Sequence, residues 1–116
     1  MAFIRHVVLE KMKEKDVVVL NVLSEGDYRK IRIKGSYNLP YAKDPAGFTS
    51  MVEALFGRDK FFITHCSGAT CMAGPNAAKA LRKAGLKAED YPGGMQDWLD
   101  AGYPVEGTDV PISTAA

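Results

Sequence analysis

An α/β fold with a mostly parallel sheet is predicted by the order of apolar segments along the chain. Residues 17–20 form a short, wholly apolar run, and residues 61–64 form a second run of nearly the same character. Such runs, rich in β-branched and aromatic side chains, are typical of strands buried on both faces. Neighbouring segments space their apolar residues at helical intervals. Strands that alternate with helices favour a layered α/β domain.

The elements predicted for the first half of the chain are short. Residues 3–14 place apolar side chains on one face of a helix, and residues 17–20 follow as a buried strand. Ser24 suits the start of the next helix, because its hydroxyl can accept a hydrogen bond from a free N–H group of the first turn. Residues 36–39 can form another short strand, which Pro40 closes.

The second half of the chain continues the alternation beyond its buried strand. Residues 45–55 carry an apolar stripe that begins with a proline, a residue suited to a first helical turn, and Gly57 ends this helix. A further helix is predicted over residues 75–84, with cations in its last turn. Residues 88–91 form the last predicted strand. A short helix then surrounds Trp98, which we expect to be a packing residue.

Length and charge limit the class of protein. With 116 residues the chain has room for one domain and one core. The formal net charge is +1, with acidic and basic residues interleaved, so a nucleic-acid partner is not expected. Residues 29–34 hold four cations. This stretch could attract an anion locally, but a solvated face is the favoured interpretation.

Residues 1–15 have no features of a secretory signal, because charges interrupt every apolar stretch. No run approaches the roughly 18 apolar residues of a membrane span. We therefore expect a cytoplasmic protein without a membrane partner. Two cysteines in such a chain indicate reactive thiols or inert core residues rather than a structural disulfide.

Cys66 is the residue whose position suggests chemistry. It comes directly after a predicted buried strand and before a predicted helix. Ligands of open α/β sheets bind at the carboxyl ends of strands, and a helix N-terminus offers free N–H groups to an anion. A thiolate held there would be a nucleophile. The backbone expected to cradle the sulfur is that of Ser67, Gly68, Ala69, Thr70, Cys71 and Met72.

Three stretches, taken in order, resemble the signatures of the rhodanese family. Residues 17–28 followed by 33–40 resemble the first signature, in which an apolar strand leads to an acidic-aromatic pair and then to Gly-Ala-x-Asn-x-Pro. Residues 62–66 resemble the strand that leads to the catalytic cysteine of the family. Residues 91–98 with 101–105 are similar to the closing Gly-Gly-x-x-x-Trp and Gly-x-Pro-Val signature.

This resemblance implies a rhodanese-like α/β fold over residues 1–106, with a roughly five-stranded, mostly parallel sheet flanked by helices on both faces. Residues 107–116 lack periodicity and are expected to form a loose tail. The resemblance also implies a sulfurtransferase. Cys66 would take sulfane sulfur from a small donor, become a persulfide, and pass the sulfur to a thiol, a cyanide-like acceptor or a protein. No metal and no organic cofactor is implied.

The chain departs from the family pattern near the catalytic loop. Active members often carry an arginine a few residues after the cysteine, whereas residues 67–72 contain no cation. Tight recognition of a dianion such as thiosulfate is therefore not expected, and a persulfide or polysulfide donor is favoured. A cysteine-dependent phosphatase is disfavoured for the same reason. Because the spacing to the next helix is longer than usual, the loop could have six or seven residues.

Cys71 has two interpretations. If the loop curls, its sulfur could meet that of Cys66 and form a disulfide or a redox-sensing pair. Alternatively, Cys71 faces the core at the start of the following helix. A metal site that joins His65 to the two cysteines is disfavoured, because strand alternation places His65 on the opposite side of the sheet from Cys66.

Three functions follow as hypotheses. The first is a sulfurtransferase or persulfide carrier that uses Cys66. The second is a thiol-redox protein that uses Cys66 and Cys71 together. The third is a rhodanese-like module that binds a partner without catalysis, in which case Cys66 would be unreactive near neutral pH.

Overall fold

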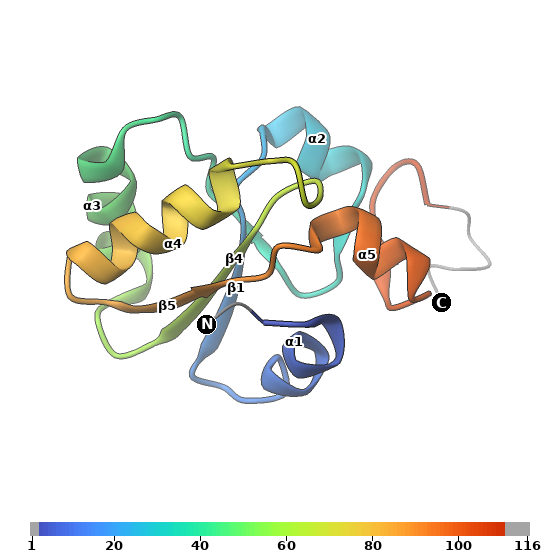
Figure 1. Ribbon diagram of the computed structural model, residues 1–116, viewed down its shortest axis with the longest axis horizontal. Coiled ribbons are helices and arrows are strands. Elements are labelled where there is room, and N and C mark those ends of the chain that lie inside the picture. The colour runs from blue at the N-terminus through green and yellow to red at the C-terminus, as the bar shows by residue number, and fades with distance from the viewer. Residues whose placement is uncertain (1–2, 111–116) are drawn as a thin grey trace.

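The computed structural model describes residues 3–110, which form a four-stranded parallel sheet with helices on both faces and a separate two-stranded ladder (Figure 1). In chain order the elements are α1 (Arg5–Lys11), β1 (Val17–Asn21), α2 (Glu25–Lys30), β2 (Arg32–Ile33), β3 (Tyr37–Asn38), α3 (Pro45–Phe56), β4 (Phe61–His65), α4 (Ala73–Lys83), β5 (Lys87–Asp90), α5 (Gly94–Asp100) and β6 (Val105–Glu106). The predicted α/β class is confirmed. The main sheet has four strands rather than roughly five.

The main sheet has the strand order β3-β1-β4-β5, and each neighbouring pair is parallel. Its two central strands pair over their whole length, from Val17 opposite Phe61 to Asn21 opposite His65. Both strands are buried after their first residue. The apolar runs seen in the sequence therefore mark the centre of the sheet, where helices cover both faces.

Strand alternation divides the core into two clusters, one on each face of the sheet. Leu20 and Phe62 point toward α3 and α4, and Val19 and Ile63 point toward α1 and α5. Trp98 is buried in the second cluster and donates a hydrogen bond from Nε1 to the Pro104 carbonyl oxygen at 2.9 Å. The prediction that Trp98 is a packing residue is confirmed.

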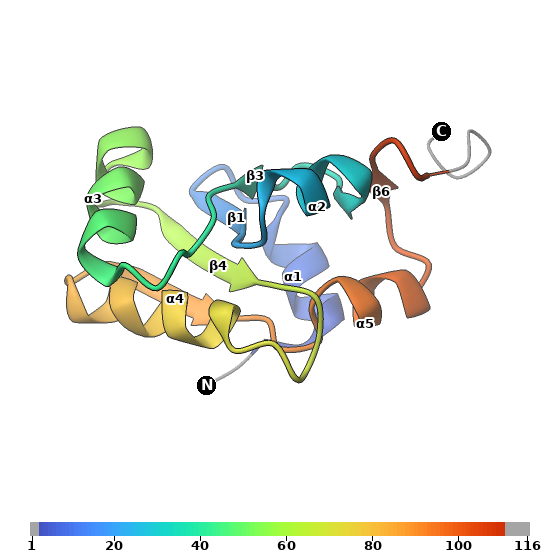
Figure 2. The same cartoon turned by 90° about the horizontal axis from the view of Figure 1, so that it is seen from above.

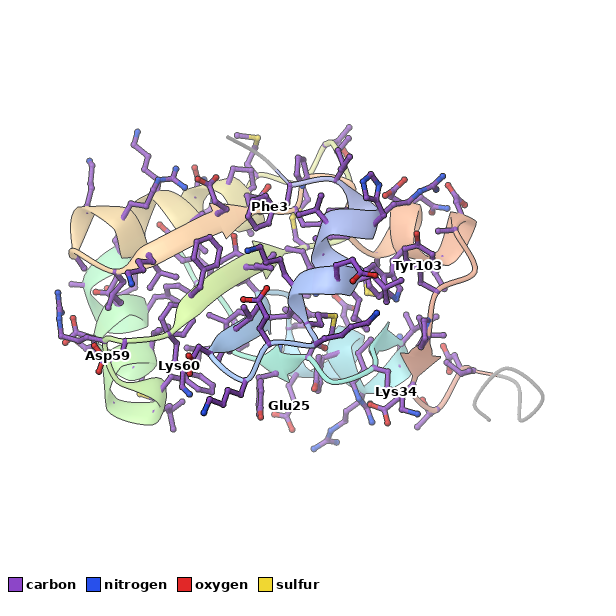
Figure 3. The ribbon with its side chains drawn as sticks, turned by 90° about the horizontal axis from the view of Figure 1, so that it is seen from below. Phe3, Glu25, Lys34, Asp59, Lys60 and Tyr103 are labelled. Atoms are coloured by element: carbon purple, nitrogen blue, oxygen red, sulfur yellow. A yellow bond between two sulfur atoms is a disulfide. The ribbon has the colours of Figure 1, made fainter. Side chains whose placement is uncertain are left out.

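The N-terminal segment is pinned along the edge strand β5. Phe3 is labelled in Figure 3. Its N–H group donates to the Asp90 carbonyl oxygen at 2.9 Å, and its ring stacks on that of Phe61 with centroids 5.7 Å apart. These contacts cover one face of the sheet before α1 begins at Arg5. The helix is therefore shorter than the predicted span of residues 3–14, whose first residues are extended backbone.

The predicted end residues Ser24 and Gly57 cap α2 and α3, whereas α1 and α4 begin and end elsewhere than predicted. The Ser24 hydroxyl accepts a hydrogen bond from the Asp27 N–H group at 3.2 Å, as an N-cap should. Helix α4 begins at Ala73, two residues before the predicted start at Pro75. The first turn of a helix tolerates proline, because its N–H groups have no intrahelical partner. Over residues 3–110, no helix is both long and apolar enough to span a membrane.

The two-stranded ladder of β2 and β6 was not predicted from the sequence, because two residues carry no periodicity. It is antiparallel and pairs Ile33 with Val105. Beyond it, the Thr108 N–H group donates to the Arg29 carbonyl oxygen at 3.0 Å. Part of the predicted tail, 107–116, is therefore hydrogen-bonded to the end of α2, and residues 111–116 lie outside the described part of the chain.

The assigned core makes a direct prediction for stability. Leu81 of α4 is fully buried, so Leu81→Ala should lower the free energy of unfolding by about 2–5 kcal/mol. Leu55→Ala makes the same change at a side chain that is 60% exposed, and it should cost less than about 0.5 kcal/mol. Urea denaturation of both variants measures the difference. Equal losses would contradict the assigned core.

Candidate active site

Cys66 follows the last residue of β4, at the carboxyl edge of the sheet. Its side chain is 3% exposed and packs in the core cluster that lies under α3 and α4. His65, one residue earlier, is fully buried and lies near Tyr91, a residue of the other core cluster. The predicted placement of these two side chains on opposite sides of the sheet is confirmed. His65 is thereby kept apart from the sulfur.

The N-terminus of α4 meets the Cys66 sulfur. The Gly74 N–H group, in the first turn of this helix, donates to Cys66 Sγ at 3.4 Å. An N–H group and the positive end of a helix dipole both favour negative charge on the sulfur. The Cys71 carbonyl oxygen lies 3.3 Å from the same sulfur and would accept the proton of a neutral thiol. These two contacts would suit a reduced Cys66 as a thiolate and as a neutral thiol, respectively.

Gly74 is a site residue that the sequence analysis missed. The predicted cradle stopped at Met72, but the N–H group that reaches the sulfur comes from two residues further along the chain. Within the predicted cradle, the Cys71 N–H group donates to the Gly68 carbonyl oxygen at 3.1 Å and closes a turn. Met72 is the N-cap residue of α4. Gly74 could have been identified in the sequence, because it lies directly before Pro75 at a predicted helix start.

The loop after Cys66 is also attached to the N-terminus of α5, which it approaches in Figure 2. The Met95 N–H group donates to the Cys66 carbonyl oxygen at 3.0 Å, and the Gln96 N–H group donates to the Ser67 carbonyl oxygen at 2.9 Å. Gly94 has a φ of 60°, and a Cβ atom at this position would collide with the Cys66 carbonyl oxygen. Gly94 of the closing glycine pair therefore permits the close approach of α5 to the Cys66 loop.

Cys71 is bonded to Cys66 in a disulfide, with Cα atoms 6.3 Å apart. This separation lies in the range that disulfides require without movement of the backbone. The two sulfurs therefore meet, as one of the two interpretations of Cys71 required. Cys71 is also half-buried against the core cluster of α3 and α4. The remaining loop side chains face solvent to differing degrees: Ser67, Ala69, Thr70 and Met72 are exposed, and Gly68 is half-buried.

A buried polar network lies beneath the sulfur. Thr64 and Asp90 are paired in register at the ends of β4 and β5. Thr64 Oγ1 lies 2.8 Å from the Gly74 carbonyl oxygen and 3.1 Å from Asp90 Oδ1. A hydroxyl has one proton for these two acceptors. The hydroxyl proton is therefore shared between the Gly74 carbonyl oxygen and the Asp90 carboxylate.

Burial raises the pKa of Asp90 to about 6, although the Thr64 hydrogen bond, a backbone hydrogen bond and the positive charge of Arg82 oppose the rise. The negative charge of Glu89 adds to it. Asp90 as a whole is 8% exposed, which agrees with desolvation as the largest cause. Thr64 and Asp90 had no distinguishing motif in the sequence, and only their register in the sheet brings them together beneath Gly74.

His65 forms a second buried polar pair, with Asn21 of β1 opposite it in register. Burial lowers the pKa of His65 to about 4, and the contact of Nδ1 with the Cys66 carbonyl oxygen at 3.3 Å offsets this only in part. The ring is therefore neutral near pH 7 and donates from Nδ1. Within residues 3–110, no cluster of three or more histidine, cysteine or acidic side chains is placed to hold a metal ion.

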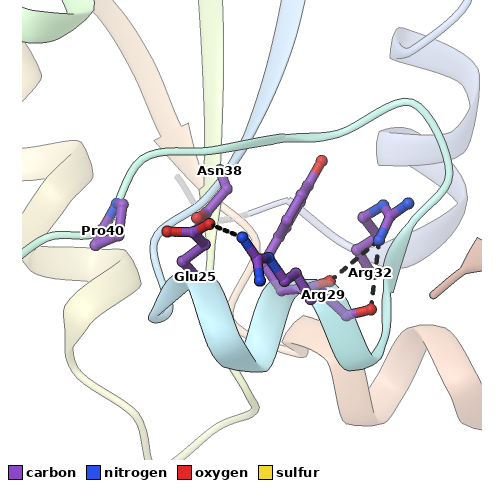
Figure 4. Close-up of a pocket in the computed structure, with 6 residues that line it drawn as sticks. Glu25, Arg29, Arg32, Asn38 and Pro40 are labelled. Carbon is purple, nitrogen blue, oxygen red and sulfur yellow. Dashed lines mark hydrogen bonds and ion pairs between the residues drawn. The ribbon is translucent and has the colours of Figure 1, made fainter. Parts of the chain in front are cut away.

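The basic stretch of residues 29–34 borders a pocket of about 610 Å³ over α2 (Figure 4). Arg29 pairs with Glu25, and Arg32 lies over the Tyr28 ring and within 3.7 Å of Glu106. These acidic partners agree with the interpretation as a solvated face. The residues that line the pocket are Glu25, Tyr28, Arg29, Arg32, Asn38 and Pro40, so no residue of the Cys66 loop is among them.

The sequence model of the rhodanese-like domain family matches residues 5–101, which include every element from α1 to α5. The chain belongs to the rhodanese-like domain family. Solved structures of other proteins share the fold of this rhodanese-like chain. A Bacillus halodurans protein is 21% identical with a TM-score of 0.82, covering 93% of this chain and 77% of its own. A rhodanese-related protein of Thermoplasma volcanium is 25% identical with a TM-score of 0.71, covering 90% and 96%.

A segment similar to this chain is part of a longer curated protein. The HTH-type transcriptional regulator of Mycobacterium tuberculosis is 29% identical over 105 residues, which cover 90% of the rhodanese-like chain. The match covers 44% of the regulator. The rhodanese-like chain thus spans less than half the length of this relative.

The contact between α5 and the loop predicts different effects at two glycines. Gly94 and Gly102 both have positive φ, but a Cβ atom at Gly102 would meet nothing within 4 Å. Gly102→Ala should cost about 1 kcal/mol for the backbone conformation alone. Gly94→Ala should cost at least about 2–3 kcal/mol, because it adds a collision with the Cys66 carbonyl group. Denaturant titrations give both values, and equal losses would contradict the proposed tight contact.

The two buried titratable groups predict opposite dependences of stability on pH. The pKa of Asp90 rises on folding from 3.8 to about 6, so the folded state binds more protons and stability falls as pH rises between these values. The pKa of His65 falls on folding from 6.5 to about 4, so stability rises with pH across that window. In the wild type these slopes oppose each other between about pH 4 and 6.

When one of the two groups is removed, the remaining pH dependence of stability should be the one that the other group causes. Asp90→Asn should become more stable relative to wild type as pH rises from about 4 to 6, and His65→Asn should become less stable relative to wild type over the same range. Urea midpoints measured at several pH values test this. Parallel pH profiles for the wild type and both variants would show that neither group titrates as assigned.

Proposed function

We propose that this rhodanese-like chain is a sulfurtransferase that carries sulfane sulfur as a persulfide on Cys66. The observation that carries the proposal is the hydrogen bond from the Gly74 N–H group to Cys66 Sγ, at the junction of β4 and α4. A nucleophilic thiolate needs such a donor, and the carboxyl edge of a parallel sheet is where ligands of α/β folds bind. Membership of the rhodanese-like family supports the same reaction.

The reaction requires two displacements at sulfur. The Cys66 thiolate attacks the sulfane sulfur of a donor R–S–SH, a new S–S bond forms, and the donor thiolate leaves with the electron pair of the broken bond. An acceptor, a thiolate or cyanide, then attacks the outer sulfur of the persulfide and restores the Cys66 thiolate. Proton transfer to solvent balances each step, and the scheme uses no metal and no organic cofactor.

The charge of the loop favours persulfide or polysulfide donors over thiosulfate. No cation lies in residues 67–72. A dianion would therefore meet backbone N–H groups without the bidentate guanidinium that recognises such oxyanions best. A persulfide donor carries less charge and places its reactive sulfur at the end of a short chain, which suits a sulfur that is 3% exposed.

The disulfide must be reduced before Cys66 can accept sulfur, since a thiolate is the nucleophile. A reducing compartment such as the cytoplasm supplies this condition, and it is the location that we propose. In that compartment the bond between Cys66 and Cys71 would form transiently.

The same bond favours a second candidate function, a dithiol–disulfide couple built from Cys66 and Cys71. The relative named as a transcriptional regulator supports such a role, because a reversible disulfide can report the redox state to an attached domain. Mild oxidation should then remove about 2 Da, or two hydrogens, from the reduced chain, and Cys71→Ser should abolish this loss. A chain whose Cys66 resists alkylation near neutral pH would instead favour a binding module.

Sulfur transfer to cyanide tests the first proposal. For the reduced protein, Cys66→Ser should lower the rate by at least about 100-fold, and polysulfide should be a better donor than thiosulfate. Cys71→Ser is the matched control, because it removes a thiol from the same loop, and it should transfer at least as much sulfur as wild type. Undiminished transfer by Cys66→Ser would refute the assignment of Cys66.

A further inference from the structure

Cys66 and Cys71 have unequal surroundings although they are bonded to each other. Cys66 is 3% exposed and receives the Gly74 N–H group at 3.4 Å. Cys71 is more exposed, and its own N–H group is engaged in the turn to the Gly68 carbonyl oxygen. One sulfur is therefore stabilised as a thiolate, and the other is closer to solvent.

We propose that Cys71 attacks the inner sulfur of a Cys66 persulfide and expels hydrosulfide, so that the chain reduces sulfane sulfur to sulfide at the expense of external thiols. This inference rests on the proposed function, because it begins from the persulfide on Cys66. It adds a product, sulfide, and a second substrate class, thiol reductants.

The internal step balances in atoms and electrons. The Cys71 thiolate attacks Cys66 Sγ, the bond between the two cysteine sulfurs forms, and the bond from Cys66 Sγ to the outer sulfur breaks. The outer sulfur leaves as HS⁻ with the electron pair of that bond. The sulfane sulfur is thereby reduced, and the two cysteines end as the disulfide that the structure contains.

The loop geometry directs the attack to the inner sulfur. The turn between Gly68 and Cys71 holds the two sulfurs in bonding contact, with Cα atoms 6.3 Å apart. Attack on the outer sulfur would require Cys71 to move away from Cys66 Sγ to make room for one more sulfur atom between them. It would leave a persulfide on Cys71. That alternative releases no sulfide, so the two outcomes differ in a measurable product.

The exposure of the two sulfurs also assigns the entry point of the reductant. An incoming thiolate reaches Cys71 more easily, because Cys66 is almost completely buried. Attack on Cys71 makes Cys66 the leaving group, and the Gly74 N–H group stabilises the departing thiolate. A second thiol then removes the mixed disulfide from Cys71, which completes the oxidation of two thiols to one disulfide.

The test is a single turnover without oxygen. Reduced, desalted protein is mixed with sodium tetrasulfide, sulfide is trapped with monobromobimane, and intact masses are recorded. Wild type should lose about 2 Da, or two hydrogens, and release about one more sulfide per chain than Cys71→Ser. Cys71→Ser should gain about 32 Da, or one sulfur, and retain it. Cys66→Ser should show neither the disulfide nor this resolved sulfide.

The outcomes separate failure of this inference from failure of the proposed function. A wild type that retains an added sulfur, on either cysteine, without extra sulfide overturns the inference, while the persulfide on Cys71→Ser still supports sulfur transfer. If Cys71→Ser gains no sulfur at Cys66, the proposed function fails first.

The entry of the reductant has its own readout. The disulfide form of the wild type is treated briefly with glutathione, quenched in acid and digested. The glutathione adduct is expected on Cys71, and an adduct confined to Cys66 would overturn the assigned direction of attack.

Discussion

Two helix N-termini converge on the residue at the end of β4, and the rest of the site depends on this constraint. The N–H group of Gly74 in α4 reaches the Cys66 sulfur, and that of Met95 in α5 reaches the Cys66 carbonyl oxygen. One helix therefore sets the electrostatics of the side chain, and the other holds its backbone. Because both helices pack on opposite faces of the same sheet, the core that supports them also positions the sulfur.

Buried polar residues under this junction affect the stability of the fold and lie next to Cys66. Thr64 and Asp90 lie on the α4 side, where the hydroxyl joins the acid to the Gly74 carbonyl oxygen. His65 and Asn21 lie on the other side, buried without full hydrogen bonding at His65 Nε2 and Asn21 Nδ2. Buried polar groups of this kind oppose folding. Their concentration next to Cys66 is typical of sites where local stability is lost to chemical function.

Family membership and particular chemistry are separate conclusions for this chain. The fold and the position of Cys66 place it among rhodanese-like domains. Its loop differs from the usual pattern of active members in two ways that act together. The absence of a cation in residues 67–72 leaves an oxyanion without the guanidinium that would hold it best, and a second thiol within bonding reach offers a different outcome for a persulfide. Under the proposed function, both differences favour exchange among thiols, persulfides and sulfide over thiosulfate chemistry.

Local patterns in the sequence determined the class of fold, the two central strands, the helix caps Ser24 and Gly57 and the candidate nucleophile Cys66. These features depend on burial periodicity, capping and backbone conformation, which act over a few residues. Only the tertiary structure decided the role of Gly74, the pairing of Thr64 with Asp90, the ladder of β2 and β6, and the bond between Cys66 and Cys71. Each of these depends on where a helix start, a strand register or a loop closure places groups in space. Residue order alone does not specify such distances, because they arise from the packing of the whole sheet and its helices.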